Sequence, residues 1–382
     1  MGTGDSAVET TSVRGRWYHF AACVGSAVLL VVLLFVPAAT SALLRAEHWA
    51  SDWRTAFLSD RLDAAHPKVA IVYVTEDSIE EFPAILPINR GYLARLVTAL
   101  DEAGAVAIGL DFYFARHTEP SDDAKLISAL QHSKDKVVLG VYETSRNKLQ
   151  LAYQLNFIAK AQARAGYINL ASEADRIVRY RASPPSDARY KDSFSSALAK
   201  MGGWSEADQP ERIGWLLAPA NGGDTFLEIE AHKLLRASPE ERSALLKGRV
   251  VLVGGKLFTL DRHGTPLSVR TQDEMTGVEI HAQMVAELID NNRSYRELNS
   301  LQTRILLAVL ICVAVPLGLR YRRREFDFLD WRWASLTAIA LDLALFRFRH
   351  LILPFTLTSV AWIASVTVGT QLRNAIAWWQ SR

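Results

Sequence analysis

Hydrophobic residues gather at the two ends of the chain, and a long stretch of mixed polarity separates them. The first apolar run extends from Phe20 to about Ala42 and contains no charged residue. As a helix, a run of this length crosses a hydrocarbon core of ~30 Å. Arg14 and Arg16 precede the run, which places the N-terminus in the cytoplasm by the positive-inside rule. A cleaved signal peptide is the alternative, but the run exceeds a usual signal core of roughly 7–15 residues.

Three more apolar runs lie near the end of the chain. They cover Thr303–Leu319, Trp333–Phe346 and Leu351–Thr370, and the link Arg347–His350 is short enough to predict a tight hairpin. A basic cluster follows the first of these runs and is expected in the cytoplasm; it consists of Arg320, Arg322, Arg323 and Arg324. We therefore expect four spans, with both chain ends in the cytoplasm and the middle segment outside.

Asp342 lies inside the third of these four spans, where a carboxylate is unusual. It is either a functional carboxylate packed against neighbouring helices or a group that pairs with a local arginine in a partly interfacial segment. Together with Arg322 and Arg323 of the basic loop, Asp342 is a candidate for coupling the middle segment to an output protein.

The middle segment alternates apolar strands with amphipathic helices. Lys68–Thr75 reads as a buried strand, and a helix with apolar residues at helical spacing follows between a capping Asn89 and Gly104. The strand Ala105–Leu110 comes next, which completes a strand–helix–strand unit with a right-handed parallel crossover. Further expected elements are a helix at 122–132, a strand at 136–142, a helix ending at 240–246 and a strand at 249–254. The fold class is therefore α/β, with a mixed, mainly parallel sheet and flanking helices, and the looser segment 143–215 predicts an insertion with an antiparallel piece.

Charge and cysteine content narrow the function classes. The net charge of +2 and the absence of a basic helix face argue against nucleic-acid binding. Cys23 and Cys312 both fall in apolar runs, so a disulfide framework is excluded. We expect no enzymatic activity, cofactor or metal: His117 and His132 lack metal-ligand spacing, and Gly254-Gly255-Lys256 lacks the glycine spacing of a phosphate loop.

Candidate binding residues follow from the strand order. Ligands of parallel sheets bind beyond the carboxyl ends of the strands. Five residues follow predicted strands in this way: Asp77, Asp111, Asp261, Arg262 and His281. They could form a polar pocket for a small ligand or a metal ion. The structural alternative is that Asp77 and Asp111 cap helices or turns, Asp261 pairs with Arg262, and His281 is a satisfied core residue.

Several ordered motifs resemble a known family. They are Asp60-Arg61, IVYVTEDSI from Ile71, Asn89-Arg90, AIGLDFYF from Ala107, LKGRVVLVGG from Leu246, Asp261-Arg262, Thr265-Pro266-Leu267 and MTGVEIHA from Met275. Their order and spacing resemble the CHASE domain of the second type, over roughly Ala50 to Arg296. The resemblance implies an extracytoplasmic sensor domain of a bacterial transmembrane receptor, in the periplasm or extracellular space, with flanking spans in the cytoplasmic membrane. Receptors of that kind usually carry a kinase or cyclase output, and none of those motifs occurs in these residues.

The expected organisation combines both arguments: N-terminal tail 1–18, transmembrane helix 19–42, extracytoplasmic sensor domain 43–300, transmembrane helix 301–320, basic loop 321–332, transmembrane helices 333–348 and 351–371, and cytoplasmic tail 372–382. With so short a tail, we expect a sensor module without its own output, which signals through a separate cytoplasmic or membrane protein. Its ligand would be a small molecule or an envelope protein, and it could form a homodimer. A scaffolding membrane subunit and an exported enzyme are the alternative functions.

Overall fold

Six short strands form one parallel sheet in the middle of the chain. The strands are β1 (Val69–Val74), β2 (Ala107–Leu110), β3 (Val137–Val141), β4 (Arg164–Tyr167), β7 (Leu227–Glu230) and β8 (Val250–Gly255). The order across the sheet is β4-β3-β2-β8-β1-β7, and every pairing is parallel. Leu252 of β8 lies between Ile71 of β1 and Gly109 of β2 in the register. The late strand β8 therefore joins two strands that come much earlier in the sequence.

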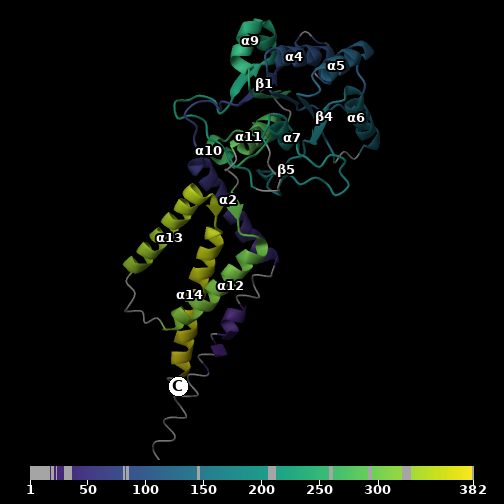
Figure 1. Ribbon diagram of the computed structural model, residues 1–382. Coiled ribbons are helices and arrows are strands. Elements are labelled where there is room, and N and C mark those ends of the chain that lie inside the picture. Colours follow the sequence, from purple (N-terminus) through teal and green to yellow (C-terminus); the bar gives the residue numbers. More distant parts are fainter. Residues whose placement is uncertain are drawn as a thin grey trace, which may run out of the picture. The chain divides into compact units, whose positions relative to one another are not determined.

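The computed structural model describes residues 18, 21–22, 24–29, 37–80, 82, 86–143, 147–204, 212–257, 261–290, 295–320 and 328–380 (Figure 1). The chain divides into two compact units: Thr55–Tyr295 forms one, and the segments before Thr55 and after Tyr295 form the other. The expected sensor domain, 43–300, is wider than the unit Thr55–Tyr295. Residues 43–54 belong to the helix α2 (Pro37–Leu58), most of which falls in the other unit.

Helices cover both faces of the parallel sheet. One group comprises α4 (Arg90–Glu102), α5 (Pro120–His132), α6 (Lys148–Ala161), α8 (Ala231–Arg236) and α9 (Pro239–Leu246); the other comprises α7 (Phe194–Met201) and α11 (Gly277–Asp290). Successive side chains of a strand point to opposite faces. Ala70, Val72 and Val74 of β1 accordingly pack with the first group, while the alternate residues of the same strand pack with the second. Burial on both faces explains why β1 is apolar throughout.

The predicted strand–helix–strand unit is confirmed, including its caps. The Asn89 side chain accepts a hydrogen bond from the Tyr92 N–H at 2.8 Å, and α4 begins at Arg90. Gly104 has φ of +81°, a conformation that glycine adopts without the steric cost of a Cβ atom. The short helix α3 (Glu76–Ile79) lies between β1 and α4, and the short helix α10 (Ser268–Thr271) comes much later in the globular unit.

The segment 143–215 contains the expected antiparallel piece and also more. The strands β5 (Ala171–Ser172) and β6 (Val178–Tyr180) pair antiparallel, as do β9 (Arg262–His263) and β10 (Met275–Thr276) further on. However, α6 leads from β3 to β4, and β4 adds a further parallel strand to the sheet. The sequence pattern did not predict these two elements. The edge strand β7 was missed as well, because its alternating Leu-Glu-Ile-Glu sequence lacks the continuous apolar run of a central strand.

The second unit contains long helices: α12 (Ser300–Arg320), α13 (Phe328–Arg349) and α14 (Phe355–Gln380), with α2 up to Arg54. By length and composition, α12 and α14 could each cross a membrane, with mean hydropathies of 2.0 and 1.2. They approach closely at two glycines, since a Cβ atom built on Gly369 would lie 2.9 Å from the Cα atom of Gly318. Such small-residue contacts are typical of helices packed in membranes. Of the four expected spans, two thus meet this criterion among the described residues. The middle of the first span, 30–36, lies outside the described residues, and α13 is helical but less apolar.

The predicted boundaries near the C-terminus need four corrections. The expected hairpin at Arg347–His350 is wrong: α13 continues to Arg349, and β12 (Leu351–Ile352) pairs in parallel with β11 (Arg296–Glu297). The last helix begins at Phe355 and not at Leu351, because Pro354 disfavours helical backbone in the residue before it. The expected tail 372–382 is helical as far as Gln380, and the expected loop 321–332 already enters α13 at Phe328.

The packing of β8 against α11 gives a stability prediction. A Cβ atom on Gly254 would lie 2.5 Å from the Val278 Cβ atom, whereas a Cβ atom on Gly255 would have no neighbour within 4 Å. Gly254→Ala should therefore destabilise the fold by about 1–3 kcal/mol through overpacking. Gly255→Ala is the matched control and should change stability by less than about 0.5 kcal/mol. Thermal unfolding of the two variants in detergent checks this, and equal melting temperatures would contradict it.

Candidate functional site

A pocket of about 600 Å³ opens beyond the carboxyl ends of β2 and β8. Asp111 directly follows β2, and its N–H donates to the Val253 carbonyl of β8 at 2.9 Å. Asp261 and His263 reach the pocket from the segment around β9, and Gly277 and His281 reach it from the first turns of α11. The full described lining is Leu86, Ile88, Asp111, Phe112, Tyr113, Tyr142, Ile168, Leu170, Ser172, Gly255, Leu257, Asp261, His263, Gly277 and His281. Three of the five predicted residues, Asp111, Asp261 and His281, therefore line one pocket.

The Asp111 side chain is half-buried in the pocket wall, and its carboxyl group has no hydrogen-bond partner among the described residues. Burial raises the pKa of Asp111 from 3.8 to about 8, and the negative charge of Asp261 adds to the increase. The group is thus largely protonated at neutral pH. It does not cap a helix or turn, so the structural alternative for Asp111 does not apply.

Asp261 is held at the N-terminus of α11. Its Oδ2 atom accepts the Gly277 N–H at 3.0 Å, and its Oδ1 atom lies 2.9 Å from the Nε2 atom of His263. Burial alone would raise the pKa of Asp261, but the hydrogen bond and charge of His263 and the Gly277 N–H hold it below the ordinary value. The expected pair with Arg262 is wrong, since the Arg262 guanidinium donates to the Glu274 carbonyl at 3.2 Å.

His281 is a buried residue whose ring is satisfied on both sides. Its Nδ1 atom lies 3.1 Å from the Ser195 Oγ atom, and the ring also hydrogen-bonds the backbone of Ile168. Burial lowers the pKa of His281 to about 4, so the imidazole is neutral at physiological pH. This arrangement matches the structural alternative for His281, which forms part of the pocket wall.

Aromatic residues that sequence reasoning missed form much of the pocket rim. The rings of Tyr113 and Tyr142 meet edge-on, with their centroids 5.9 Å apart, and each side chain is about 40% exposed. Phe112 lines the same pocket. The run Asp111-Phe112-Tyr113-Phe114 directly after a predicted strand was the available signal, because residues at strand ends face the ligand side of a parallel sheet.

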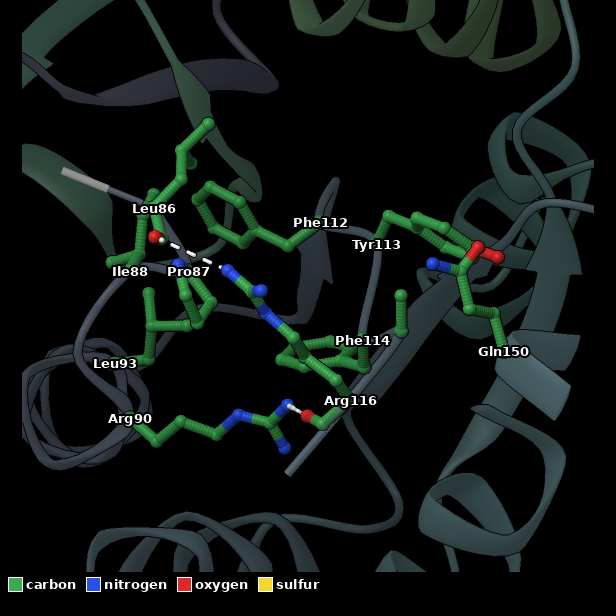
Figure 2. Close-up of a pocket in the computed structure, with 11 residues that line it drawn as sticks. Leu86, Pro87, Ile88, Arg90, Leu93, Phe112, Tyr113, Phe114, Arg116 and Gln150 are labelled. Atoms are coloured by element: carbon green, nitrogen blue, oxygen red, sulfur yellow. Dashed lines mark hydrogen bonds between the residues drawn. The ribbon is translucent and has the colours of Figure 1, made fainter. Parts of the chain in front are cut away.

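A smaller hollow of about 350 Å³ adjoins this pocket and shares Leu86, Ile88, Phe112 and Tyr113 with it. Figure 2 shows the Arg116 side chain extending across this hollow toward Leu86, whose carbonyl oxygen accepts a hydrogen bond from the Arg116 Nη2 atom at 3.4 Å. The remaining walls are mainly apolar, so the hollow could hold an uncharged part of a ligand.

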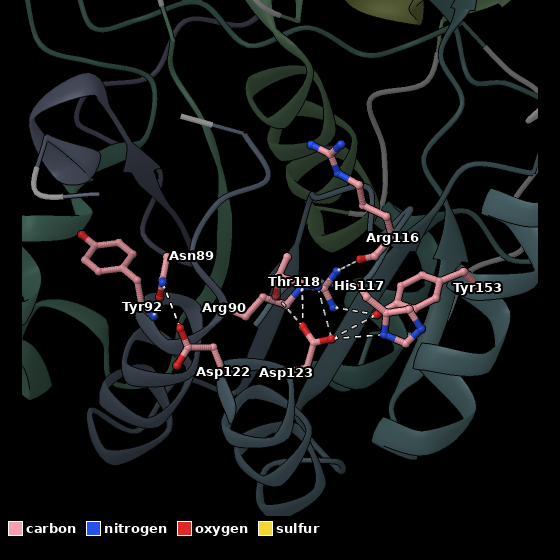
Figure 3. A network of polar contacts seen from close by, with 9 residues as sticks. All are labelled: Asn89, Arg90, Tyr92, Arg116, His117, Thr118, Asp122, Asp123 and Tyr153. Atoms are coloured by element: carbon pink, nitrogen blue, oxygen red, sulfur yellow. Dashed lines mark hydrogen bonds and ion pairs between the residues drawn. The ribbon is translucent and has the colours of Figure 1, made fainter. Parts of the chain in front are cut away.

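Arg90 is a buried cation that contacts the loop after β2, next to this hollow. Its guanidinium lies 3.4 Å from the Asp123 carboxylate and donates to the Arg116 carbonyl at 2.6 Å (Figure 3). It also stacks near the rings of Phe114 and Phe157, at 5.0 and 4.7 Å from their centroids. All its strong contacts are internal, which gives Arg90 a structural role in holding the loop after β2.

Asp77 and Arg262 do not reach the pocket. Asp77 lies in α3 beside Glu230 and His232, and one ligand atom of each falls within 4.8 Å of the others. This is a donor set that could hold a divalent cation. However, Asp77 is exposed and Glu230 is already bound to Lys233 at 2.6 Å. Arg262 faces a separate hollow that Lys256, Arg270 and Glu279 also line.

The candidate coupling residue Asp342 belongs to a buried ionic cluster in the helical unit. Its Oδ2 atom accepts from Arg54 Nη1 at 2.6 Å, and Arg54 Nη2 donates to Glu47 at 2.8 Å. Glu47 in turn accepts the N–H groups of Thr356 and Leu357 in the first turn of α14, at 2.8 and 3.2 Å. Asp342 thus pairs with an arginine 288 residues away and not with a local one. The other coupling candidates, Arg322 and Arg323, lie outside the described residues.

Comparison with known proteins gives one match. The family model described as CHASE2 domain matches residues 27–319, which covers the whole globular unit and most of α12. The searches of curated proteins and of solved structures each returned no match.

The pKa of Asp111 predicts an unusual pH dependence for one variant. Because the folded-state pKa of about 8 exceeds the ordinary value of 3.8, the folded chain retains a proton that the unfolded chain loses in this range. Asp111 therefore disfavours folding increasingly as the pH rises. Asp111→Asn should raise the melting temperature little near pH 4 and most above about pH 8. Thermal unfolding of the full chain across this range measures the effect.

Asp261→Asn is the matched variant, and its expected effect on the melting temperature has the opposite sign. The lowered pKa of Asp261 means that its carboxylate stabilises the fold above the ordinary pKa, and this stabilisation is lost as the pH falls. The variant should melt earlier than the parent at neutral pH, and the deficit should shrink in acid. A gain for Asp111→Asn that is the same at every pH would contradict the burial of that carboxyl group.

The ionic cluster predicts a second pair of variants. Asp342→Leu leaves the buried Arg54 charge without one of its two carboxylates, and losing one partner of a buried ion pair costs about 3–5 kcal/mol. Adding Arg54→Met removes the unpaired charge and should recover most of this loss, while Glu47 keeps its hydrogen bonds to α14. Melting temperatures in detergent test the pair. A double variant no more stable than Asp342→Leu alone would show that Arg54 and Asp342 are not coupled.

Proposed function

The chain belongs to the CHASE2 domain family, a family of extracytoplasmic sensor domains, and from this membership we propose a specific role. The protein is a membrane-anchored sensor whose domain Thr55–Tyr295 lies outside the cytoplasm and binds a small ligand in the pocket around Asp111. The family match carries the sensory role. The position of the pocket and the apolar helices support the ligand site and the anchoring.

The carboxyl group of Asp111, which has no hydrogen-bond partner among the described residues, supports the ligand site. Evolved domains seldom leave a partly desolvated carboxyl group without a hydrogen bond, because desolvation of the group costs free energy. Asp111 carries this cost at the carboxyl ends of β2 and β8, where parallel sheets bind their ligands. A perturbed pKa in a cleft is typical of functional sites. A ligand that pairs with Asp111 would offset the cost in the bound state.

A route for the signal begins where the chain enters and leaves the domain. The Ser59 hydroxyl and the hydroxyl of Tyr295, the last residue of the domain, lie 2.9 Å apart. Upstream of Ser59, α2 is one continuous helix from Pro37 to Leu58. Downstream of Tyr295, α12 begins at Ser300. A ligand-dependent change at this junction would therefore be passed to α2 and α12 together.

Within the helical unit, the Glu47–Arg54–Asp342 cluster would distribute that change. It connects α2 to α13 through Asp342 and to the first turn of α14 through Glu47. A shift of α2 would break or remake these contacts, which gives the unit two distinguishable arrangements. A typical coupling of about 1–3 kcal/mol between ligand and output requires only a modest preference for one arrangement. The output protein would read the change from the helices or from the basic loop with Arg322 and Arg323.

Membrane topology tests this proposal directly. In a background with Cys23→Ser and Cys312→Ser, Leu149→Cys places a single thiol on the domain surface, where Leu149 is 82% exposed. A membrane-impermeant maleimide should label this thiol in intact spheroplasts. Glu325→Cys, in the basic loop, is the matched control and should react only after permeabilisation.

The reverse labelling pattern would overturn the extracytoplasmic placement. Labelling of Leu149→Cys only after permeabilisation would place the domain in the cytoplasm. Labelling of both thiols in intact spheroplasts would mean that α12 does not separate them across the membrane. Either result would contradict the proposed sensor.

A further inference from the structure

The charges around the Asp111 pocket are acidic. Asp111 and Asp261 line it, and no lysine or arginine side chain does so within the described part of the chain. Its two imidazoles do not reverse this balance, because His281 is neutral and His263 is bound to Asp261. An anionic ligand would therefore meet the Asp261 carboxylate without a fixed positive charge to hold it.

The rim supplies a second feature that attracts positive charge. Tyr113 and Tyr142 present partly exposed rings that meet at 5.9 Å, and Phe112 adds a third ring to the wall. The negative faces of aromatic rings attract cations, and groups of such rings recognise ammonium ligands. Tyr113 and Tyr142 are 38% and 43% exposed, so part of each ring surface can be reached by a ligand, while Phe112 is partly buried against the core.

The pocket also has room and apolar surface for more than a charged head. Its volume of about 600 Å³ is within the range of small-molecule sites, roughly 300–1,000 Å³. Leu86, Ile88 and Leu257 contribute aliphatic wall beside the acidic and aromatic residues. A ligand that combines a positive charge with apolar substituents would therefore contact all three kinds of surface.

We propose that this pocket binds an organic cation, an amine or quaternary ammonium group with small apolar substituents, held between the Asp111–Asp261 pair and the aromatic rim. This inference rests on the proposed function, since it names the ligand class of the same pocket. The cation supplies the counter-charge that Asp111 lacks. A neutral polyol could hydrogen-bond Asp111, but it would gain nothing from the charge of Asp261 or from the ring faces.

The proposal carries a pH dependence. The titratable groups that line the pocket are Asp111, Asp261, His263, His281 and the two tyrosines. Of these, Asp111 changes charge near neutrality, with a pKa of about 8. A cation binds the carboxylate form better than the protonated form, so its affinity should rise as the pH increases from about 6 to 8. Cation binding should correspondingly release a proton.

The test uses the full chain in lipid nanodiscs and isothermal titration calorimetry. The probes are choline, tetramethylammonium and 3,3-dimethylbutan-1-ol, which has the shape of choline without its charge. At least one of the two cations should bind at least tenfold more tightly than the neutral alcohol. At about pH 9, where Asp111 is ionised, Asp111→Asn and Tyr142→Leu should each weaken that binding about tenfold. Asp135→Asn, an exposed carboxylate in the turn before β3, is the matched control and should leave affinity unchanged.

Three results would overturn the proposal. Equal binding of choline and the alcohol would show that the pocket recognises shape and not charge. Cation binding that survives Asp111→Asn would place the cation elsewhere. Absence of binding by both cations up to high millimolar concentration, with the parent melting temperature intact, would reject this ligand class. None of these results affects the topology labelling, so the sensor proposal and the cation proposal can fail separately.

Discussion

The insertion of β8 between β1 and β2 is the constraint on which the globular unit depends. β8 comes some 140 residues after β2 in the chain, yet it pairs with both early strands along their whole length. Because all three strands are parallel, their carboxyl ends meet at one edge of the sheet. The loop after β2 is thereby brought against the segment after β8, and Asp111 meets Asp261. Without this pairing neither the two cores nor the pocket would form.

The parts of the fold that could be predicted are those in which local sequence and tertiary packing agree. β1 and β8 are continuous apolar runs because both faces of the sheet are covered, and α4 carries its own cap at Asn89. β4 and β7 could not be predicted, because Arg164-Ala-Gly-Tyr and Leu-Glu-Ile-Glu at the sheet edges have no such run. Edge strands depend on the neighbour that they pair with more than on their own composition.

The candidate site could also be predicted only in part, because local sequence identifies strand ends but not the loops that meet there. The strand-end rule identified Asp111, Asp261 and His281, but it specifies only the edge of the sheet. It does not say which loops converge along that edge, and Asp77 accordingly lies with Glu230 and His232 instead. The partner of Asp342 could not be predicted at all, since Arg54 is 288 residues away in the sequence and no local pattern connects the two residues. The strand-end position of Phe112 and Tyr113 was a signal for the aromatic rim, but only the structure shows that Tyr113 meets Tyr142.

The proposed ligand site depends on the Asp111 carboxyl group, which is half-buried in the pocket wall and has no hydrogen-bond partner among the described residues. Infrared difference spectroscopy of the full chain, with Asp111→Asn as the reference, measures the protonation of this one group directly. The account predicts a protonated carboxyl band that is present at neutral pH and disappears with a midpoint of about 8. A band that disappears near the ordinary value of 3.8 would mean that Asp111 is an ordinary hydrated carboxylate, and it would contradict the account.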